Sequence, residues 1–162
     1  MPADVLTVGD ALATAFTNRF ALLVPPCICE RVYETTHDLG EVDGRKVEIY
    51  PLSYVPFEPA TREEAYYDFR YSIVTLERFR EHKRVPRIWL DDRVTFVEEQ
   101  IFNPLDPTNK ERAELILVID SDSYWPIEVE CTTVYEYNIL RQNKVFWSEV
   151  EVVFRKLDKG LV

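Results

Sequence analysis

Four acidic side chains near the ends of expected strands are the best candidates for catalytic chemistry. They are Asp120, Asp122, Glu128 and Glu130. Carboxylates at the ends of adjacent strands can hold magnesium and activate water, as in metal-dependent nucleases. A nuclease of the restriction-endonuclease kind adds a lysine two residues after an acid, whereas here Glu130 follows Glu128 and Thr132 follows Glu130. Because alternating acidic and apolar residues are also typical of a solvent-facing strand, a nuclease remains the less favoured alternative.

The cysteines and histidines form no recognisable metal or nucleophile motif. Cys27 and Cys29 are separated by one residue. Structural zinc needs four ligands, usually from two closely spaced pairs, and Cys131, His37 and His82 are not paired with them in sequence. A catalytic histidine also needs a nucleophile in reach, and no GxSxG or comparable motif is present. We therefore predict no catalytic, cofactor-binding or metal-ligating residue, and we interpret the cysteines as ordinary residues at a strand edge.

Composition limits the classes of function. The chain has 162 residues, a net charge of −10 and only four glycines, and it contains neither GxGxxG nor GxxxxGK[ST]. A phosphate-cradling loop and direct high-affinity duplex binding are therefore disfavoured. The three cysteines are an odd count, which suits a reducing compartment. We find no signal-peptide pattern and no apolar run long enough to span a membrane, so we expect the cytoplasm or a particle assembled there.

The first half of the chain predicts one helix followed by strands. Helical spacing of apolar residues predicts an amphipathic helix opening near Thr7, where Thr7 and Asp10 resemble a capping box. Its apolar residues are Val8, Leu12, Ala15, Phe16 and Phe20. Strands are expected at 28–34, at 46–50 before Pro51, and at 66–75, where alternation is clean. Residues 51–64, with three prolines, are predicted to form an extended loop.

The second half predicts a helix and three further strands. A helix beginning near Pro86 carries an apolar stripe and should stop at Asn103-Pro104. That stripe consists of Leu90, Val94, Val97, Ile101 and Leu105. Residues 115–119 are expected to form a strand buried on both faces, followed by strands at 127–134 and 145–157. The whole chain, residues 1–162, therefore predicts one α+β domain with a single antiparallel or mixed sheet of about six strands and two main helices on one side.

Two surface segments are singled out by their composition. The densest basic patch contains Arg78, Arg80, Lys83, Arg84 and Arg87, and we interpret it as a solvated loop leading into a helix. In the proline-containing segment, Leu52, Tyr54, Val55 and Phe57 would be costly to leave in water. They either fold back on their own core or lie on a partner. We predict the second, a partner interface.

The order of segments resembles the small tail-terminator or tail-completion proteins of tailed bacteriophages. The resemblance starts at residues 4–12, DVLTVGDAL, and continues at residues 45–52, RKVEIYPL. A variable loop and the long strand at 66–76 follow. It ends in residues 130–150, ECTTVYEYNILRQNKVFWSEV, which look like the closing strand of that family.

The resemblance implies a structural virion protein without enzymatic activity. Such proteins form a ring, typically sixfold, that caps the tail tube beneath the head connector. The expected partners are copies of the chain, the tail tube protein and a head-completion or connector protein, with DNA only as passing cargo and no membrane. Acids on the channel wall would keep that DNA mobile, and the candidates are Glu128, Glu130, Glu149 and Glu151. An acidic interaction or inhibitor module remains the main alternative.

Overall fold

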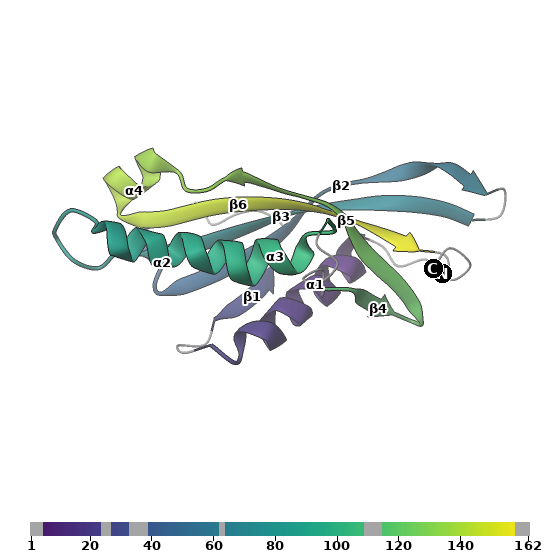
Figure 1. Ribbon diagram of the computed structural model, residues 1–162, viewed down its shortest axis with the longest axis horizontal. Coiled ribbons are helices and arrows are strands. Elements are labelled where there is room, and N and C mark those ends of the chain that lie inside the picture. Colours follow the sequence, from purple (N-terminus) through teal and green to yellow (C-terminus); the bar gives the residue numbers. More distant parts are fainter. Residues whose placement is uncertain (1–4, 24–26, 33–38, 62–63, 109–114, 158–162) are drawn as a thin grey trace.

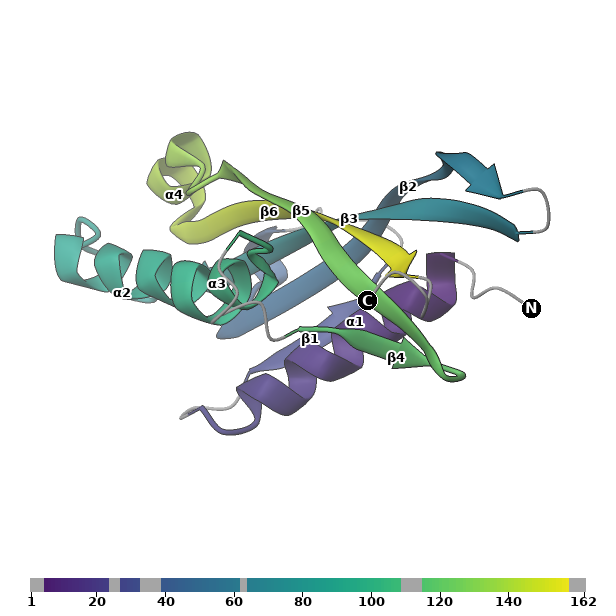
Figure 2. The same ribbon diagram turned by 45° about the vertical axis from the view of Figure 1, so that its right-hand side comes forward.

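The computed structural model describes residues 5–23, 27–32, 39–61, 64–108 and 115–157, without the side chains of residues 28, 53–61, 64–67 and 157. It has an α+β fold in which a six-stranded mixed sheet curls into a half-barrel (Figures 1 and 2). Two main helices pack on one face of the sheet, and their apolar residues share one core with it. The predicted fold class is therefore confirmed.

The order of helices and strands along the chain is close to the predicted order. The elements are α1 (Val5–Phe20), β1 (Ile28–Arg31), η1 (Leu39–Glu41), β2 (Arg45–Thr61), β3 (Glu64–Arg78), α2 (Arg87–Val97), η2 (Glu98–Phe102), α3 (Asn103–Leu105), β4 (Leu117–Ile119), β5 (Asp122–Thr133), α4 (Tyr137–Asn143) and β6 (Val145–Leu157). The sheet order is β1-β2-β3-β6-β5-β4. The β1–β2 pair is parallel and the other pairs are antiparallel.

Helix α1 packs on the sheet with its predicted apolar stripe. Val8, Leu12, Phe16 and Phe20 are all fully buried. The predicted capping box at Thr7 is wrong, because the helix already includes Val5 and Thr7 lies inside its first turns. The hydroxyl of Tyr71 on β3 donates to the carbonyl oxygen of Val5 at 2.5 Å, which ties this end of the helix to the sheet.

The second helix is nearly continuous from α2 through η2 to α3. Val97, Ile101 and Leu105 of its apolar stripe are buried. Segment η2 is a π-helical turn, where the amide of Asn103 donates to the carbonyl oxygen of Glu98, five residues back. Pro104 has no amide hydrogen, so it cannot make the next helical bond. The helix extends one residue past the predicted stop, with Pro104 in its last turn.

The prediction of a loop at residues 51–64 is wrong, and Pro51 does not close β2. Residues 51–61 continue β2, and β3 begins at Glu64. Beyond Ile49, where pairing with β1 ends, the only described strand partner of β2 is β3. Proline cannot donate a hydrogen bond to a neighbouring strand. It is tolerated on an edge strand, at positions where the backbone amide would point away from the neighbouring strand and no inter-strand hydrogen bond is lost. The prolines therefore lie within a long hairpin.

Strand β4 also differs from its prediction. It covers only Leu117–Ile119 at one edge of the sheet. Leu117 is buried but Val118 is 68% exposed, so the strand is buried on one face and not on both. A two-residue turn joins it to β5, and Asp120 and Ser121 both have positive φ there, as a type I′ hairpin requires.

The last part of the chain contains one unpredicted helix. Strand β5 begins five residues earlier than expected, β6 has the predicted bounds, and α4 lies between them. The main core lies between the sheet and the two long helices, where the rings of Phe20 and Phe96 are 5.4 Å apart. A smaller cluster lies on the opposite face. It consists of Val42, Val74, Leu76 and Val145, with Ile139 of α4 packed against it.

Candidate functional site

The four predicted channel acids lie together on the sheet face that points away from the two long helices. Glu128 and Glu130 are on β5 and Glu149 and Glu151 are on the neighbouring β6. Glu130 is directly opposite Glu151 in the register. Val150 and Val152, which are adjacent to Glu149 and Glu151 in β6, are buried in the main core. Because successive side chains of a strand point to opposite faces of the sheet, the acids point away from that core. We call these four residues the acidic sheet face.

Glu149 is held in place by three hydroxyl groups. Ser72 and Tyr50 each donate to its Oε2 at 2.7 Å, and Thr132 donates to its Oε1 at 2.8 Å. Partial burial raises the pKa of Glu149, but the hydrogen bonds from Ser72, Tyr50 and Thr132 outweigh it and hold the pKa below its usual value. Burial, together with the nearby Glu149, raises the pKa of Tyr50 to about 12 although Ser72 lowers it. A fixed carboxylate thus tethers β2, β3 and β5 to β6.

Other charges on this face are partly compensated. Arg70 lies 3.4 Å from Glu151, and Arg155 makes two contacts with Asp68 at 2.7 and 2.9 Å. Glu128 and Glu130 are exposed. The most solvent-accessible negative charge of the acidic sheet face therefore belongs to β5.

The four predicted interface residues belong to β2, at the start of the part of the β2–β3 hairpin that extends beyond the neighbouring strands. Leu52 is 40% exposed and lies at a register shift between Pro51 and Ser53. Tyr54, Val55 and Phe57 follow it, and their side chains lie outside the described set. Pairing of β3 with β6 begins only at Asp68. We call residues 53–61 of β2 and 64–67 of β3 the hairpin arm, and these strand ends project past the other strands (Figure 1).

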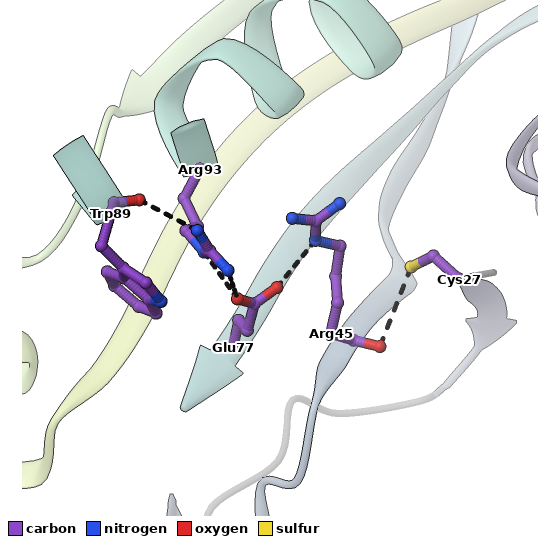
Figure 3. Close-up of polar contacts among 5 residues, drawn as sticks. All are labelled: Cys27, Arg45, Glu77, Trp89 and Arg93. Atoms are coloured by element: carbon purple, nitrogen blue, oxygen red, sulfur yellow. Dashed lines mark hydrogen bonds and ion pairs between the residues drawn. The ribbon is translucent and has the colours of Figure 1, made fainter. Parts of the chain in front are cut away.

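A buried carboxylate links α2 to the sheet, and sequence analysis missed it. Glu77 of β3 is 7% exposed, and Arg45 of β2 donates to its Oε1 at 2.8 Å. Arg93 of α2 donates to its Oε2 at 2.5 Å and also to the carbonyl oxygen of Trp89 at 3.2 Å (Figure 3). The Arg93 guanidinium lies over the Trp89 ring, 4.3 Å from its centroid. This arrangement fits a structural anchor, because both arginines and the carboxylate are already paired.

Cys27 and Cys29 are buried thiols, and Cys27 lies next to this anchor. Burial raises the pKa of Cys27 to about 11, although Arg45 lowers it, and burial raises the pKa of Cys29 well above its usual value. The Cys27 thiol contacts the carbonyl oxygen of Arg45 at 3.8 Å (Figure 3). Both side chains are therefore protonated at neutral pH. Cys131 is half-buried.

The acids proposed for a nuclease do not converge. Asp120 occupies the β4–β5 turn, and Asp122 pairs with Lys156 at 3.4 Å. Glu128 lies six residues further along β5, which separates it from Asp122 by roughly 20 Å. In the part of the chain that the structure describes, no three His, Cys, Asp or Glu residues are grouped to hold a metal ion. His82 is exposed, and His37 lies outside the described residues.

No protein-family model matches the chain, and no curated protein matches it in sequence. Among the solved structures that match is one that carries a sequence identifier as its name, and it aligns over 98% of this chain and 97% of its own, with a TM-score of 0.47 and 8% identity. A likeness at that level carries no functional information. No described helix is long and apolar enough to cross a membrane.

Proposed function

We propose that this protein is a structural subunit of a bacteriophage neck, forming a ring that caps the tail tube and joins it to the head connector. The hairpin arm is the observation that carries this proposal. Its two strands pair with each other beyond the last described rungs to β1 and β6. A subunit with such an arm has a means of reaching its neighbour.

The physical reason is the low stability of isolated hairpins. A two-stranded ribbon is at best marginally stable in water and needs a further strand or an apolar surface to hold it. The sequence of the arm includes Tyr54, Phe57, Tyr66 and Tyr67. Aromatic residues are enriched in protein interfaces. A neighbouring subunit or an adjacent ring would supply a supporting surface, since no described strand other than β2 and β3 pairs along the arm.

The acidic sheet face supports the same proposal as a candidate channel wall. Glu128 and Glu130 are exposed, and Glu149 and Glu151 lie beside them on β6. Negative charge on a channel wall repels phosphates and keeps a passing duplex from binding. In this proposal the ring is hexameric, DNA is only cargo, and the partners are the tail tube protein and a head-completion or connector protein.

Electron microscopy of the purified chain, alone and mixed with tail tubes, tests the proposal. Rings in solution or at tube ends are expected. The matched variant replaces residues 56–67 by Asn-Gly, which joins the directly paired Val55 and Asp68 through a two-residue type I′ turn. It keeps the contact between Asp68 and Arg155 and should fold but not assemble. A wild-type chain that stays monomeric and ignores tube ends contradicts the proposal and favours the acidic inhibitor alternative.

A further inference from the structure

A basic pocket of about 620 Å³ lies between the start of α2 and α4. This end of the sheet is opposite the hairpin arm, as Figures 1 and 2 show. Among the described residues, five cationic side chains and no acidic one line the pocket. The cations are Lys83, Arg84, Arg87, Arg141 and Lys144. The proposed ring function assigns no role to this surface.

Two separate segments build the pocket. Arg84 and Arg87 flank Pro86, which caps α2, so they stand at the positive end of the helix dipole. Arg141 occupies the last turn of α4, and Lys144 is its C-cap in the left-handed conformation, with φ 57°. The carbonyl oxygen of Lys144 accepts from the amide of Phe79 at 2.7 Å, which fixes the end of α4 against the residue that follows β3. The cations are therefore brought together by the fold and not by sequence proximity alone.

Most of this positive charge has no counter-charge among the residues that the structure describes. Lys83 pairs with Glu81 at 2.7 Å, and Arg87 approaches Asp91 at 3.6 Å, both on exposed side chains. Arg84, Arg141 and Lys144 have no ion-pair partner within the described ranges. Like charges held close together repel one another. In a chain of net charge −10, a pocket with this imbalance is suited to an anion.

The remaining lining is apolar and aromatic. Val85, Pro86, Leu90 and Leu140 contribute apolar surface, and Leu140 is buried. Tyr135 and Tyr137 also line the pocket, and Tyr137 is 60% exposed. An exposed aromatic ring beside cations is the combination that stacks a base and neutralises its phosphate. The volume lies within the range of small-ligand pockets.

We propose that this pocket binds a nucleotide, with the phosphate among Arg84, Arg141 and Lys144 and the base against Tyr137. The nucleotide can come from solution or from the end of a single strand, since both offer the same chemistry. A long duplex is the less suitable ligand, because its many phosphates would be repelled by the protein, whose net charge is −10. An acidic segment of another protein is the competing ligand. We favour the nucleotide because the site is a pocket and because the exposed Tyr137 ring can stack on a base.

Calorimetric titration of the isolated chain at low salt tests this inference, independently of ring formation. The probes are ATP, inorganic phosphate, a 5′-phosphorylated single-stranded octamer and its unphosphorylated form. The test variant is Arg84→Ala with Arg141→Ala. The matched control is Arg80→Ala, because Arg80 is exposed, pairs with Asp43 and lies outside the pocket lining. Circular dichroism verifies that all three proteins are folded.

Saturable binding of ATP is expected, weakened at least about tenfold in the double variant and unchanged in Arg80→Ala. Stronger binding of the 5′-phosphorylated octamer than of the unphosphorylated one would identify a strand end as the source, and binding of ATP alone would identify free nucleotide. Absence of binding at millimolar ATP and to both octamers overturns the proposal. Equal binding by all variants overturns it as well. Binding of a polyglutamate peptide in the same titration, without any nucleotide binding, would assign the pocket to an acidic protein segment instead.

Discussion

Glu77 of β3 and Arg93 of α2 form a two-point ion pair, with Arg93 Nε 2.5 Å from Glu77 Oε2, and this pair fastens the second helix to the sheet. Glu77→Gln should therefore destabilise the fold. The substitution removes the negative charge between Arg45 and Arg93, whose side chains are only 20% and 19% exposed. Breaking a pair of this kind costs about 3 kcal/mol. Urea unfolding of the isolated chain measures the loss.

The chain offers a control with the same chemistry at the surface. Glu81 pairs with Lys83, and both side chains are more than 60% exposed. Glu81→Gln should change the free energy of unfolding by less than about 1 kcal/mol. Equal effects of the two substitutions would mean that Glu77 is not an anchor.

Glu149 makes stability depend on pH. Its folded-state pKa is lowered from the usual 4.5, so its contribution is complete above that value and is lost as the pH falls through the folded-state pKa. Glu149→Gln should reduce stability at neutral pH and flatten the decline that the wild type shows as the pH falls below 4.5. Glu128→Gln removes one exposed charge from the same face and should leave the curve nearly unchanged. Identical acid profiles for wild type and Glu149→Gln would contradict the role of the three hydroxyl donors.

The hairpin arm should matter for assembly and not for folding of the single chain. Tyr54→Ala with Phe57→Ala is expected to leave the thermal midpoint of the monomer unchanged and to abolish ring formation or binding to tail tubes. Ile88→Ala with Val118→Ala removes two exposed apolar side chains elsewhere, 73% and 68% exposed, and should retain assembly. A fall of several degrees in the midpoint of the Tyr54/Phe57 variant would instead place these residues in their own core.

Strong periodicity made some elements predictable from sequence. The bounds of β6 were predicted correctly, because buried Phe146, Val150, Val152 and Phe154 lie on one face of the strand and Glu149, Glu151 and Arg155 lie on the other. The same alternation placed the acids of β5 and β6 on one side of their strands. Helix α4 was missed, because its seven residues are too few to show an apolar stripe.

Features that depend on strand neighbours were not predictable. Proline was treated as a strand breaker at Pro51 and Pro56, but the sequence does not reveal that β2 becomes an edge strand after Ile49. The contact between Arg45 and Glu77 depends on the β2–β3 register, which pairs residues 32 positions apart. Likewise, Arg84 was recognised as part of a basic patch, but Arg141 and Lys144 join it only through the position of α4.

Substitutions of Lys144 should affect stability and ATP binding differently, because this residue is both the C-cap of α4 and part of the pocket lining. It adopts a left-handed conformation, with φ 57°, at a C-cap position where glycine is favoured. A side chain there costs roughly 1 kcal/mol. Lys144→Gly should therefore unfold at an equal or higher urea concentration than wild type, yet bind ATP more weakly because one pocket cation is lost. Lys144→Ala removes the same charge but keeps the backbone strain, so it should match the glycine variant in binding and fall below it in stability. Wild-type ATP affinity in both variants would exclude Lys144 from the proposed phosphate site.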